Sequence, residues 1–365
     1  MLHRILIAIV CILATLPAGA RAQQDERGIL IDLHRTGARK VRIELMRPEV
    51  GSTLPVAAPG LTRIADRLVR DLVYSGVLAL VEPLPGDVSL PGDVPNETNE
   101  EAVDQPADAA IALRLEGERS DALSLTARLL SPGGQNLIVG KRYVVDVADP
   151  GAAVHHFADQ VVYHLTGEPG IARTRILFSR GDREQREIHI VDYDGENLRR
   201  VTRNRSLNLA PRWSPDGGRV CYTSYHQGRQ RLLILDGSTG RSARIADYPG
   251  LNVGASWAPD GREVVVTLSR DGNAELYRID DGGAIRQRLT RDPSIECSPD
   301  FDPTGQWIVY TSDRTGVPQI YVMDQEGANR RRLTFEGRYN DSASWSPRGD
   351  RIAFVSRVDG RFQVF

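Results

Sequence analysis

The stretch Trp213-Ser-Pro-Asp-Gly217 decides the fold, because it recurs three more times at a constant spacing of 44 residues. The further copies are Trp257-Ala-Pro-Asp-Gly261, Phe301-Asp-Pro-Thr-Gly305 and Trp345-Ser-Pro-Arg-Gly349. An aspartate and a glycine keep the same period, at Asp192, Asp236, Asp280 and Asp324 and at Gly228, Gly272, Gly316 and Gly360. Three residue classes that share one period indicate an internal structural repeat.

Each repeat predicts four consecutive strands. The first strand ends at the aromatic residue, and the Pro and Gly after it predict a tight turn, because Pro fixes φ and Gly accepts a positive φ. A buried strand such as Ile308–Ser312 follows, then a hairpin at the repeated Gly. A third strand such as Ile320–Asp324 leads to a fourth that ends at Leu333-Thr334. Four strands in about 40–45 residues predict one blade of a β-propeller.

The repeats predict a propeller that does not close within this chain. The first repeat, from Ile176, has no aromatic strand of its own, and the last stops at Phe365. We therefore expect about four and a half blades in a fragment or shortened version of the protein. Open blade edges would expose unpaired backbone groups, at about 1–3 kcal/mol for each one cut off from water.

Residues 27–170 lack the period and predict a small α/β domain of two helices on a mixed sheet. Apolar residues at helical spacing predict one helix that ends at Gly76, and a second is expected from Ala152 to Leu165. Pro83–Asp108 is rich in Pro, Gly and acidic residues with little to bury, which predicts a loose surface loop. The expected strands are Ile29–His34, Val41–Met46, Val77–Val81, Ala110–Leu115, Ala122–Leu130 and Leu137–Val147.

The N-terminus predicts export. The first 22 residues are typical of a cleaved secretory signal, with a basic start, the apolar run Ile5–Leu16 and the end Ala20-Arg-Ala22. The apolar run is shorter than the ~20 residues that a membrane-spanning helix needs. The chain thus divides into a signal peptide (1–22), an α/β domain (23–170) and a propeller (171–365). Cys221 and Cys297 are expected to be free, buried thiols. Cys221 lies on a predicted strand and Cys297 in a crossover two blades later, so the distance between them should exceed the ~4.4–6.8 Å that separates the Cα atoms of a disulfide.

Charge and motifs exclude several classes of function. With 46 basic and 48 acidic residues there is no bulk cationic field, so no nucleic-acid partner is expected. The sequence contains no Gly-x-Ser-x-Gly, His-Glu-x-x-His or Cys-x-x-Cys motif, so we expect no catalytic residue, metal or cofactor. The acids Glu296, Asp300 and Asp341 near the propeller axis leave a cation site open as an alternative, although they occupy unequal positions in the repeat.

A partner-binding site is predicted at one mouth of the propeller. The crossovers between blades and the hairpins between second and third strands share this face, and a polar residue recurs there at intervals of 44 residues. Such a ring is where a propeller usually binds something; alternatively, these side chains only shape the turns. We expect replacement of Asn208 and Asn252 to weaken partner binding without affecting folding. The predicted site comprises Asn208, Leu209, Asn252, Val253, Glu296, Asn340, Asp341 and the hairpin residue His226.

The repeat resembles that of the TolB family, and two further segments support the likeness. Asp71-Leu-Val-Tyr-Ser-Gly76 is similar to the end of a helix in that family, and Leu165–Ile176 is similar to its join between domain and propeller. The acidic loop Pro83–Asp108 and Phe301-Asp302 in place of Trp-Ser depart from the family pattern.

The resemblance implies a six-bladed propeller in a periplasmic adaptor of the Tol–Pal envelope system, which serves outer-membrane integrity and cell division. It implies that the propeller mouth binds the peptidoglycan-associated lipoprotein Pal. It also implies that the N-terminal tail, including Gln23, Gln24 and Asp25, engages TolA, and that the protein meets membranes only through its partners. The alternative is a propeller enzyme or small-ligand binder with a metal or polar site in the central channel.

Overall fold

The structure, a computed structural model, describes residues 40–81, 84–86, 88, 106–119 and 121–365. These residues form two compact units. The N-terminal unit contains the described residues between Ala22 and Ile176 together with Val191–Leu198. The propeller unit contains Leu177–Ile190 and Arg199–Phe365.

The division differs from the expected domain boundary at residue 170. Residues 171–176 and the turn Val191–Leu198, both expected in the propeller, group with the N-terminal unit. The signal segment, the expected strand Ile29–His34 and most of the loop Pro83–Asp108 lie outside the described residues.

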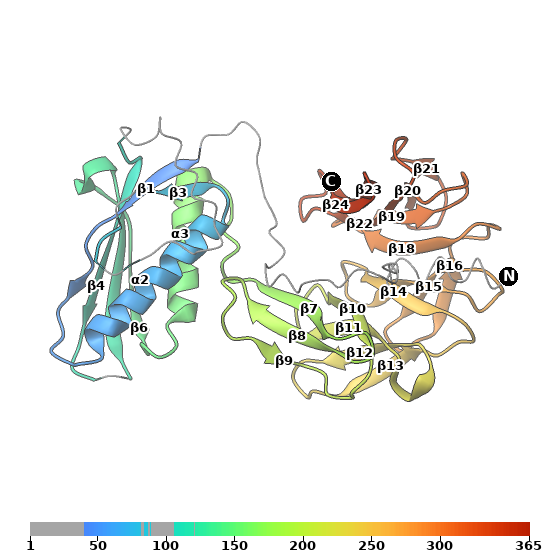
Figure 1. Cartoon of the computed structure of the whole chain (residues 1–365), viewed down its shortest axis with the longest axis horizontal. Helices are drawn as coiled ribbons and strands as arrows, with labels where there is room; N and C mark the ends of the chain where they lie inside the picture. The colour runs from blue at the N-terminus through green and yellow to red at the C-terminus, as the bar shows by residue number, and fades with distance from the viewer. Residues whose placement is uncertain (1–39, 82–83, 87, 89–105, 120) are drawn as a thin grey trace. The chain divides into compact units, whose positions relative to one another are not determined.

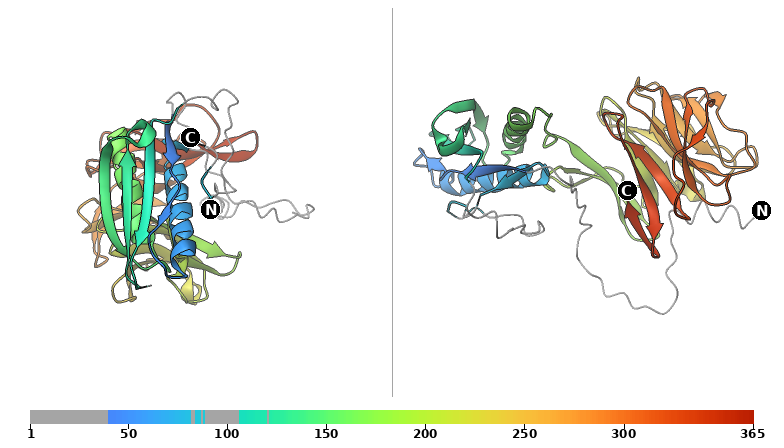
Figure 2. Two further views of the ribbon diagram at one scale, coloured as in Figure 1. Left: turned by 90° about the vertical axis from the view of Figure 1, so that its left-hand side faces the viewer. Right: turned by 90° about the horizontal axis from the view of Figure 1, so that it is seen from above.

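The N-terminal unit is a mixed six-stranded sheet with two helices on one face (Figure 1, Figure 2). The strand order is β3-β1-β4-β5-β6, with β2 beside β4. Strand β1 is parallel to β3 and β4, and β4, β5 and β6 form an antiparallel meander. The strands are β1 (Val41–Leu45), β2 (Glu49–Val50), β3 (Leu78–Leu80), β4 (Ala109–Glu116), β5 (Leu123–Leu130) and β6 (Leu137–Val145), and a 3-10 turn, η2 (Pro132–Gly134), joins the last two.

The two predicted helices are confirmed as α2 (Ala57–Tyr74) and α3 (Gly151–Thr166). After α2, Gly76 takes the positive φ of 71° that ends the helical path. Within the described residues, neither helix has both the length and the apolar character needed to cross a membrane.

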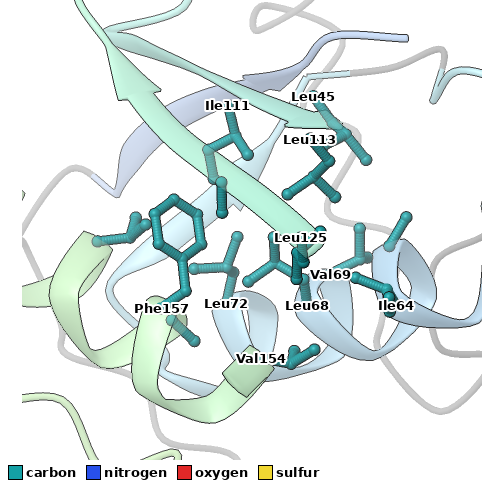
Figure 3. Packing of buried hydrophobic residues seen from close by; sticks show 14 of the residues in the cluster. Leu45, Ile64, Leu68, Val69, Leu72, Ile111, Leu113, Leu125, Val154 and Phe157 are labelled. Atoms are coloured by element: carbon teal, nitrogen blue, oxygen red, sulfur yellow. The ribbon is translucent and has the colours of Figure 1, made fainter. Parts of the chain in front are cut away.

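One apolar core joins the helices to the sheet. Figure 3 shows Leu68 and Leu72 of α2 and Phe157 of α3 packed beneath Ile111 and Leu125 of the sheet. All five side chains are at most 1% exposed. Burying side chains of this size contributes about 1.5–3 kcal/mol each, so this contact holds the helices on the sheet.

The propeller unit contains five sheets, which are the expected blades (Figure 1). The three central blades have four strands each, and the first and last have three, as the incomplete repeats predict. The blades are β7 (Arg175–Gly181), β8 (Arg186–Asp192) and β9 (Arg199–Arg200); β10 (Asn208–Trp213), β11 (Arg219–Ser224), β12 (Arg231–Asp236) and β13 (Ser242–Ala246); β14 (Asn252–Trp257), β15 (Glu263–Leu268), β16 (Glu275–Asp280) and β17 (Ile285–Arg288); β18 (Glu296–Phe301), β19 (Trp307–Ser312), β20 (Gln319–Asp324) and β21 (Arg331–Arg332); and β22 (Asn340–Trp345), β23 (Ile352–Val358) and β24 (Arg361–Val364).

The first strand of the second to fifth blades carries a β-bulge that the sequence pattern does not predict. The register with the next strand shifts within β10, β14, β18 and β22. The residue in the bulge has a positive φ each time, 49° at Ala210, 62° at Gly254, 52° at Ser298 and 56° at Ser342. Three of these four residues are not glycine, so three blades hold a backbone conformation that L-residues disfavour.

The repeated aromatic residues pack between blades. Trp257 is 6% exposed and belongs to a cluster with Cys221 and Leu232 of the preceding blade. Phe301 likewise packs with Val265 of the blade before it. Both thiols are free, as expected, but only Cys221 is buried, because Cys297 is partly exposed on β18.

Candidate functional site

The predicted site lies on a surface that we call the crossover face. It consists of the crossover segments 201–207, 247–251, 291–295 and 335–339 together with the hairpins 225–230, 269–274 and 313–318. Each hairpin is tied to the crossover before its blade by a backbone hydrogen bond, for example from Tyr225 N to Leu207 O at 2.9 Å and from Ser269 N to Leu251 O at 3.2 Å. Hairpins and crossovers therefore form one continuous surface.

Asn208, predicted to line the mouth, is fully buried at the first position of β10. Its Nδ2 donates to the carbonyls of Arg186 at 2.9 Å and Ser206 at 3.1 Å, and its Oδ1 accepts from Ser224 Oγ at 2.8 Å. The side chain thus satisfies one carbonyl of the preceding crossover and one at the start of β8 in the previous blade.

Asn252 and Asn340 also bind carbonyl groups of the preceding crossovers in their own blades, and their side chains are 0% and 2% exposed. Asn252 Nδ2 donates to Tyr248 O at 2.8 Å, and Asn340 Nδ2 donates to Glu336 O at 2.8 Å. These residues therefore begin strands instead of lying in open loops, and they shape the crossovers, which was the alternative interpretation. The expectation that they can be replaced without affecting folding does not fit this geometry.

The other predicted residues are spread over different environments. Leu209 is 7% exposed, Val253 is half-buried, and His226 is exposed on the hairpin. Asp341 is buried and accepts hydrogen bonds from Thr311 Oγ1 at 2.7 Å and Tyr339 Oη at 3.0 Å. The tail residues Gln23, Gln24 and Asp25 lie outside the described residues.

The sequence pattern missed an excess of exposed arginines on the crossover face. Two acidic side chains, Asp271 and Glu336, are exposed on these segments, and the hairpins of the first and last blades (182–185 and 359–360), which share the face, add Asp182, Glu184 and Asp359 against Arg183. No position of the crossovers and hairpins carries an arginine in every blade; Asp247 and Phe335, for example, hold the position that Arg203 and Arg291 hold in other blades. The balanced charge of the chain hides the arginines, so only their position in the fold shows the excess. The exposed arginines are Arg203, Arg205, Arg229, Arg270, Arg291 and Arg338.

Part of this positive charge is unpaired. Arg229 lies 3.3 Å from Asp247, and Arg270 stacks over the Tyr248 ring at 4.7 Å. By contrast, the side chains of Arg203 and Arg291 make no ion pair with any residue that the structure describes. An exposed surface of this kind attracts acidic groups.

The acids proposed as an alternative cation site do not converge. Both oxygens of Asp300 are occupied, by Ser256 Oγ at 2.8 Å and by Ser344 Oγ at 3.0 Å. Asp341 accepts from Thr311 of the previous blade and from Tyr339 of the crossover, and Glu296 Oε1 accepts from Arg314 Nη2 at 3.0 Å. Burial raises the pKa of the Glu296 carboxyl, and the neighbouring Arg314 opposes this. These acids therefore serve contacts inside the protein.

A second acidic cluster lies in the N-terminal unit. Ligand atoms of Asp71, His155 and Asp194 lie within 4.8 Å of one another and are buried. However, Arg67 Nη2 lies 3.2 Å from His155 Nε2, and Arg67 Nε donates to Asp194. The guanidinium group thus already supplies the positive charge that a metal ion would bring. His155 Nδ1 lies 2.7 Å from Asp71 Oδ2, which completes a buried ion-pair network.

Comparisons with known proteins agree with this fold. Residues 162–365 match the family model of the TolB beta propeller domain. The chain is 34% identical over 218 residues to a protein TolB homolog of Chlorobium chlorochromatii, covering 59% of this chain and 49% of the relative. It is 33% identical over 249 residues to a Tol-Pal system protein TolB of Aromatoleum aromaticum, covering 68% and 55%. The chain thus spans about half the length of these curated relatives.

The fold also matches a solved structure over most of the chain. The crystal structure of TolB from Acinetobacter baumannii superposes with a TM-score of 0.73 at 26% identity. The match covers 90% of this chain and 80% of that one, so it includes residues of both units.

Proposed function

Because the chain belongs to the TolB propeller family, we propose that it acts as a periplasmic adaptor of a Tol–Pal envelope system and not as an enzyme. The secretory pattern of residues 1–22 supports the periplasmic location. In this proposal the crossover face binds Pal, the N-terminal tail engages TolA, and the complex serves outer-membrane integrity and cell division.

The exposed arginines of the crossover face carry this proposal. On the crossovers and on the hairpins of the second to fourth blades, six exposed arginines against two exposed acids favour a partner with an acidic surface. Charge complementarity of this kind raises the rate of association and makes affinity depend on salt. The exposed His226 lies on the same surface, whereas the buried Asn208, Asn252 and Asn340 contribute by holding the crossovers in shape.

A calorimetric titration with soluble Pal lacking its lipid tests the proposal. We expect saturable one-to-one binding that weakens as salt is raised. The charge-reversal pair Arg203→Glu and Arg291→Glu should weaken binding by about tenfold or more, which corresponds to about 1.4 kcal/mol.

The matched control is the pair Arg241→Glu and Arg262→Glu. Both residues are exposed, and they lie in turns at the opposite ends of the strands. The control makes the same change in net charge, so it should leave the affinity nearly unchanged. Equal losses of affinity for Pal in the two double variants would show that only the overall charge of the protein matters. If the folded wild-type protein did not bind Pal at all, Pal would be excluded as its partner.

A further inference from the structure

A repeated pair of polar side chains lies at the junctions between blades. In the first junction, Asn208 Nδ2 donates to Glu187 Oε2 at 3.1 Å. In the last, Asn340 Nδ2 donates to Gln319 Oε1 at 3.0 Å. The two pairs stand at the same positions of the 44-residue repeat. In each, an amide of the incoming blade supplies a proton to an oxygen at the start of the third strand of the previous blade.

The junction between the third and fourth blades has two carboxylic acids at these positions, Glu275 and Glu296. Its backbone is arranged like that of the last junction: Glu296 N donates to Ala274 O at 2.9 Å, as Asn340 N donates to Pro318 O at 3.0 Å. Glu275 is 1% exposed and Glu296 is 0% exposed. The acid pair therefore occupies the same buried place, but neither ionised side chain can donate a hydrogen bond.

One oxygen of each acid is left without a partner. Glu275 Oε1 accepts from Asp292 N at 2.8 Å and from Arg288 Nη2 at 3.3 Å. Glu296 Oε1 accepts from Arg314 Nη2 at 3.0 Å and from two serine hydroxyls. Both Oε2 atoms are buried and have no hydrogen-bond partner among the described residues. In the first and last junctions an amide donates to the corresponding oxygen, whereas the second junction has Asn252 and Arg231 at these positions.

Charged groups around the pair favour a proton over a metal ion. Arg288 and Arg314 contact the two acids directly, and Arg330 lies 3.0 Å from Asp292, which also contacts Arg314 at 3.3 Å. Two guanidinium groups already contact the acids and a third is held at Asp292, so a divalent cation would meet stronger repulsion than a single proton. Asp271 lies 3.3 Å from Arg288 and accepts from the Tyr277 hydroxyl at 2.6 Å. The other titratable groups near the pair are Asp313 on the adjoining hairpin, Tyr310, whose hydroxyl lies 3.4 Å from Arg314, and Tyr321, over whose ring Arg314 stacks.

We infer that the Oε2 atoms of Glu275 and Glu296 face each other and that Glu296 holds a proton, which its Oε2 donates to Glu275 Oε2, so that this junction is a proton-binding site. The proton restores the donor that the amide supplies in the first and last junctions. When it leaves, two buried carboxylates repel each other beneath the crossover 291–295. Burial raises the pKa of the Glu296 carboxyl, in the direction that holds a proton, while Arg314 and the serine hydroxyls oppose it.

The site would regulate the crossover face. The crossover 291–295 carries the exposed Arg291 and is held by Asn273 Nδ2, which donates to Asp292 O at 2.8 Å. Loss of the proton should loosen this crossover and weaken partner binding as the pH rises. This consequence rests on the proposed function, whereas the proton site itself does not.

Thermal unfolding of the full chain in chelator, from about pH 5 to pH 9, tests the site. The substitution Glu296→Asn rebuilds the amide–carboxylate pair of the first junction. A proton that only the folded state holds adds to the free energy of unfolding. This contribution is complete below the ordinary carboxyl pKa of 4.5, and it is lost as the pH rises through the higher pKa that Glu296 has in the folded protein. The Tm of Glu296→Asn should therefore exceed that of the wild type by a margin that grows with pH.

The reverse substitution Asn208→Glu provides the matched control, because it creates the same acid pair with Glu187. Its Tm should fall below that of the wild type, with a deficit that also grows with pH. A Tm difference that stays constant with pH in both variants would overturn the inference. The inference would also be overturned if calcium, added at high pH, raised the Tm of the wild type but not that of Glu296→Asn. Such a result would indicate a cation between the two acids.

Binding measured at the same pH values separates the two proposals. Pal affinity that falls with pH in the wild type but not in Glu296→Asn supports regulation by the junction. A pH-independent affinity alongside the expected Tm pattern would refute the regulation and keep the proton site. Failure of Pal to bind at any pH would refute the proposed function alone.

Discussion

Asp300 connects three consecutive blades, and its replacement offers the sharpest test of how the propeller holds together. Its Oδ1 accepts from Ser256 Oγ of the previous blade at 2.8 Å. Its Oδ2 accepts from Ser344 Oγ at 3.0 Å and from Trp345 N at 2.9 Å, both in the next blade. Ser256 Oγ in turn accepts from Phe301 N at 3.2 Å, so the network joins the side chain of Ser256 on β14 to the backbone of β18 and β22.

The size of the effect follows from the groups that Asp300→Ala leaves without a partner. A hydrogen bond to a charged group contributes about 1.5–3 kcal/mol, and two serine hydroxyls can reorient while the Trp345 N–H cannot. We therefore expect a loss of about 3 kcal/mol in the free energy of unfolding. For a unit of this size, each kcal/mol lowers the Tm by about 2–4 °C, so the Tm should fall by about 6–12 °C.

Calorimetry and urea unfolding of the full chain measure this loss. Asp300→Asn should lower the free energy of unfolding by less than Asp300→Ala, because the amide Oδ1 still accepts a hydrogen bond from one blade. The control Glu326→Ala, at an exposed residue, should have a free energy of unfolding within about 0.5 kcal/mol of the wild type. The reasoning is refuted if Asp300→Ala is as stable as Glu326→Ala, since the three contacts would then contribute nothing.

Other predictions follow from local geometry. Ser298→Gly should raise stability by about 0.5–1 kcal/mol, because glycine accepts the positive φ of 52° without strain. Gly254→Ala should lower stability by a similar amount, because alanine disfavours the φ of 62°. Changes in Tm of the same sign for the two variants would contradict this. Burial alone would lower the pKa of His155, but the carboxylates of Asp71 and Asp194 outweigh it and raise the pKa above its ordinary value of 6.5. His155→Gln should therefore cost most stability below pH 6.5 and progressively less as the pH rises; a cost in Tm that grows with pH would be inconsistent with this.

Elements that depend on neighbours along the chain were predicted well. The turns at Gly217 and Gly305 have φ values of 68° and 73°, as the Pro-x-Gly pattern requires. The helix that ends before Gly76 was predicted because its buried residues repeat at the period of the helix itself. In such elements the hydrogen bonds and the alternation of burial are set within a few residues, so the pattern is present in the sequence.

The site was predicted less well, because its contacts cross from one blade to the next. The period identified Asn208 as a repeated polar residue but did not show that it donates to the carbonyls of Arg186 in the previous blade and Ser206 in the crossover. It gave Glu296 the same role, although an ionised carboxylate cannot donate the hydrogen bond that the amide of Asn208 donates. The exposed arginines do not recur in every blade, since Arg203 and Arg291 stand two periods apart with Asp247 between them, and so they escaped a search based on the period.

The sequence by itself determined the number, length and order of strands in each blade, the turns between them and the apolar face of each helix. Only the tertiary structure decided which polar side chains are buried, which oxygens lack a donor and which charges gather on one face. The physical reason is that secondary structure repeats at short range. Hydrogen bonding and charge across a blade junction instead join residues about 20 or 44 positions apart, such as Asn208 with Glu187 and Asp300 with Ser256.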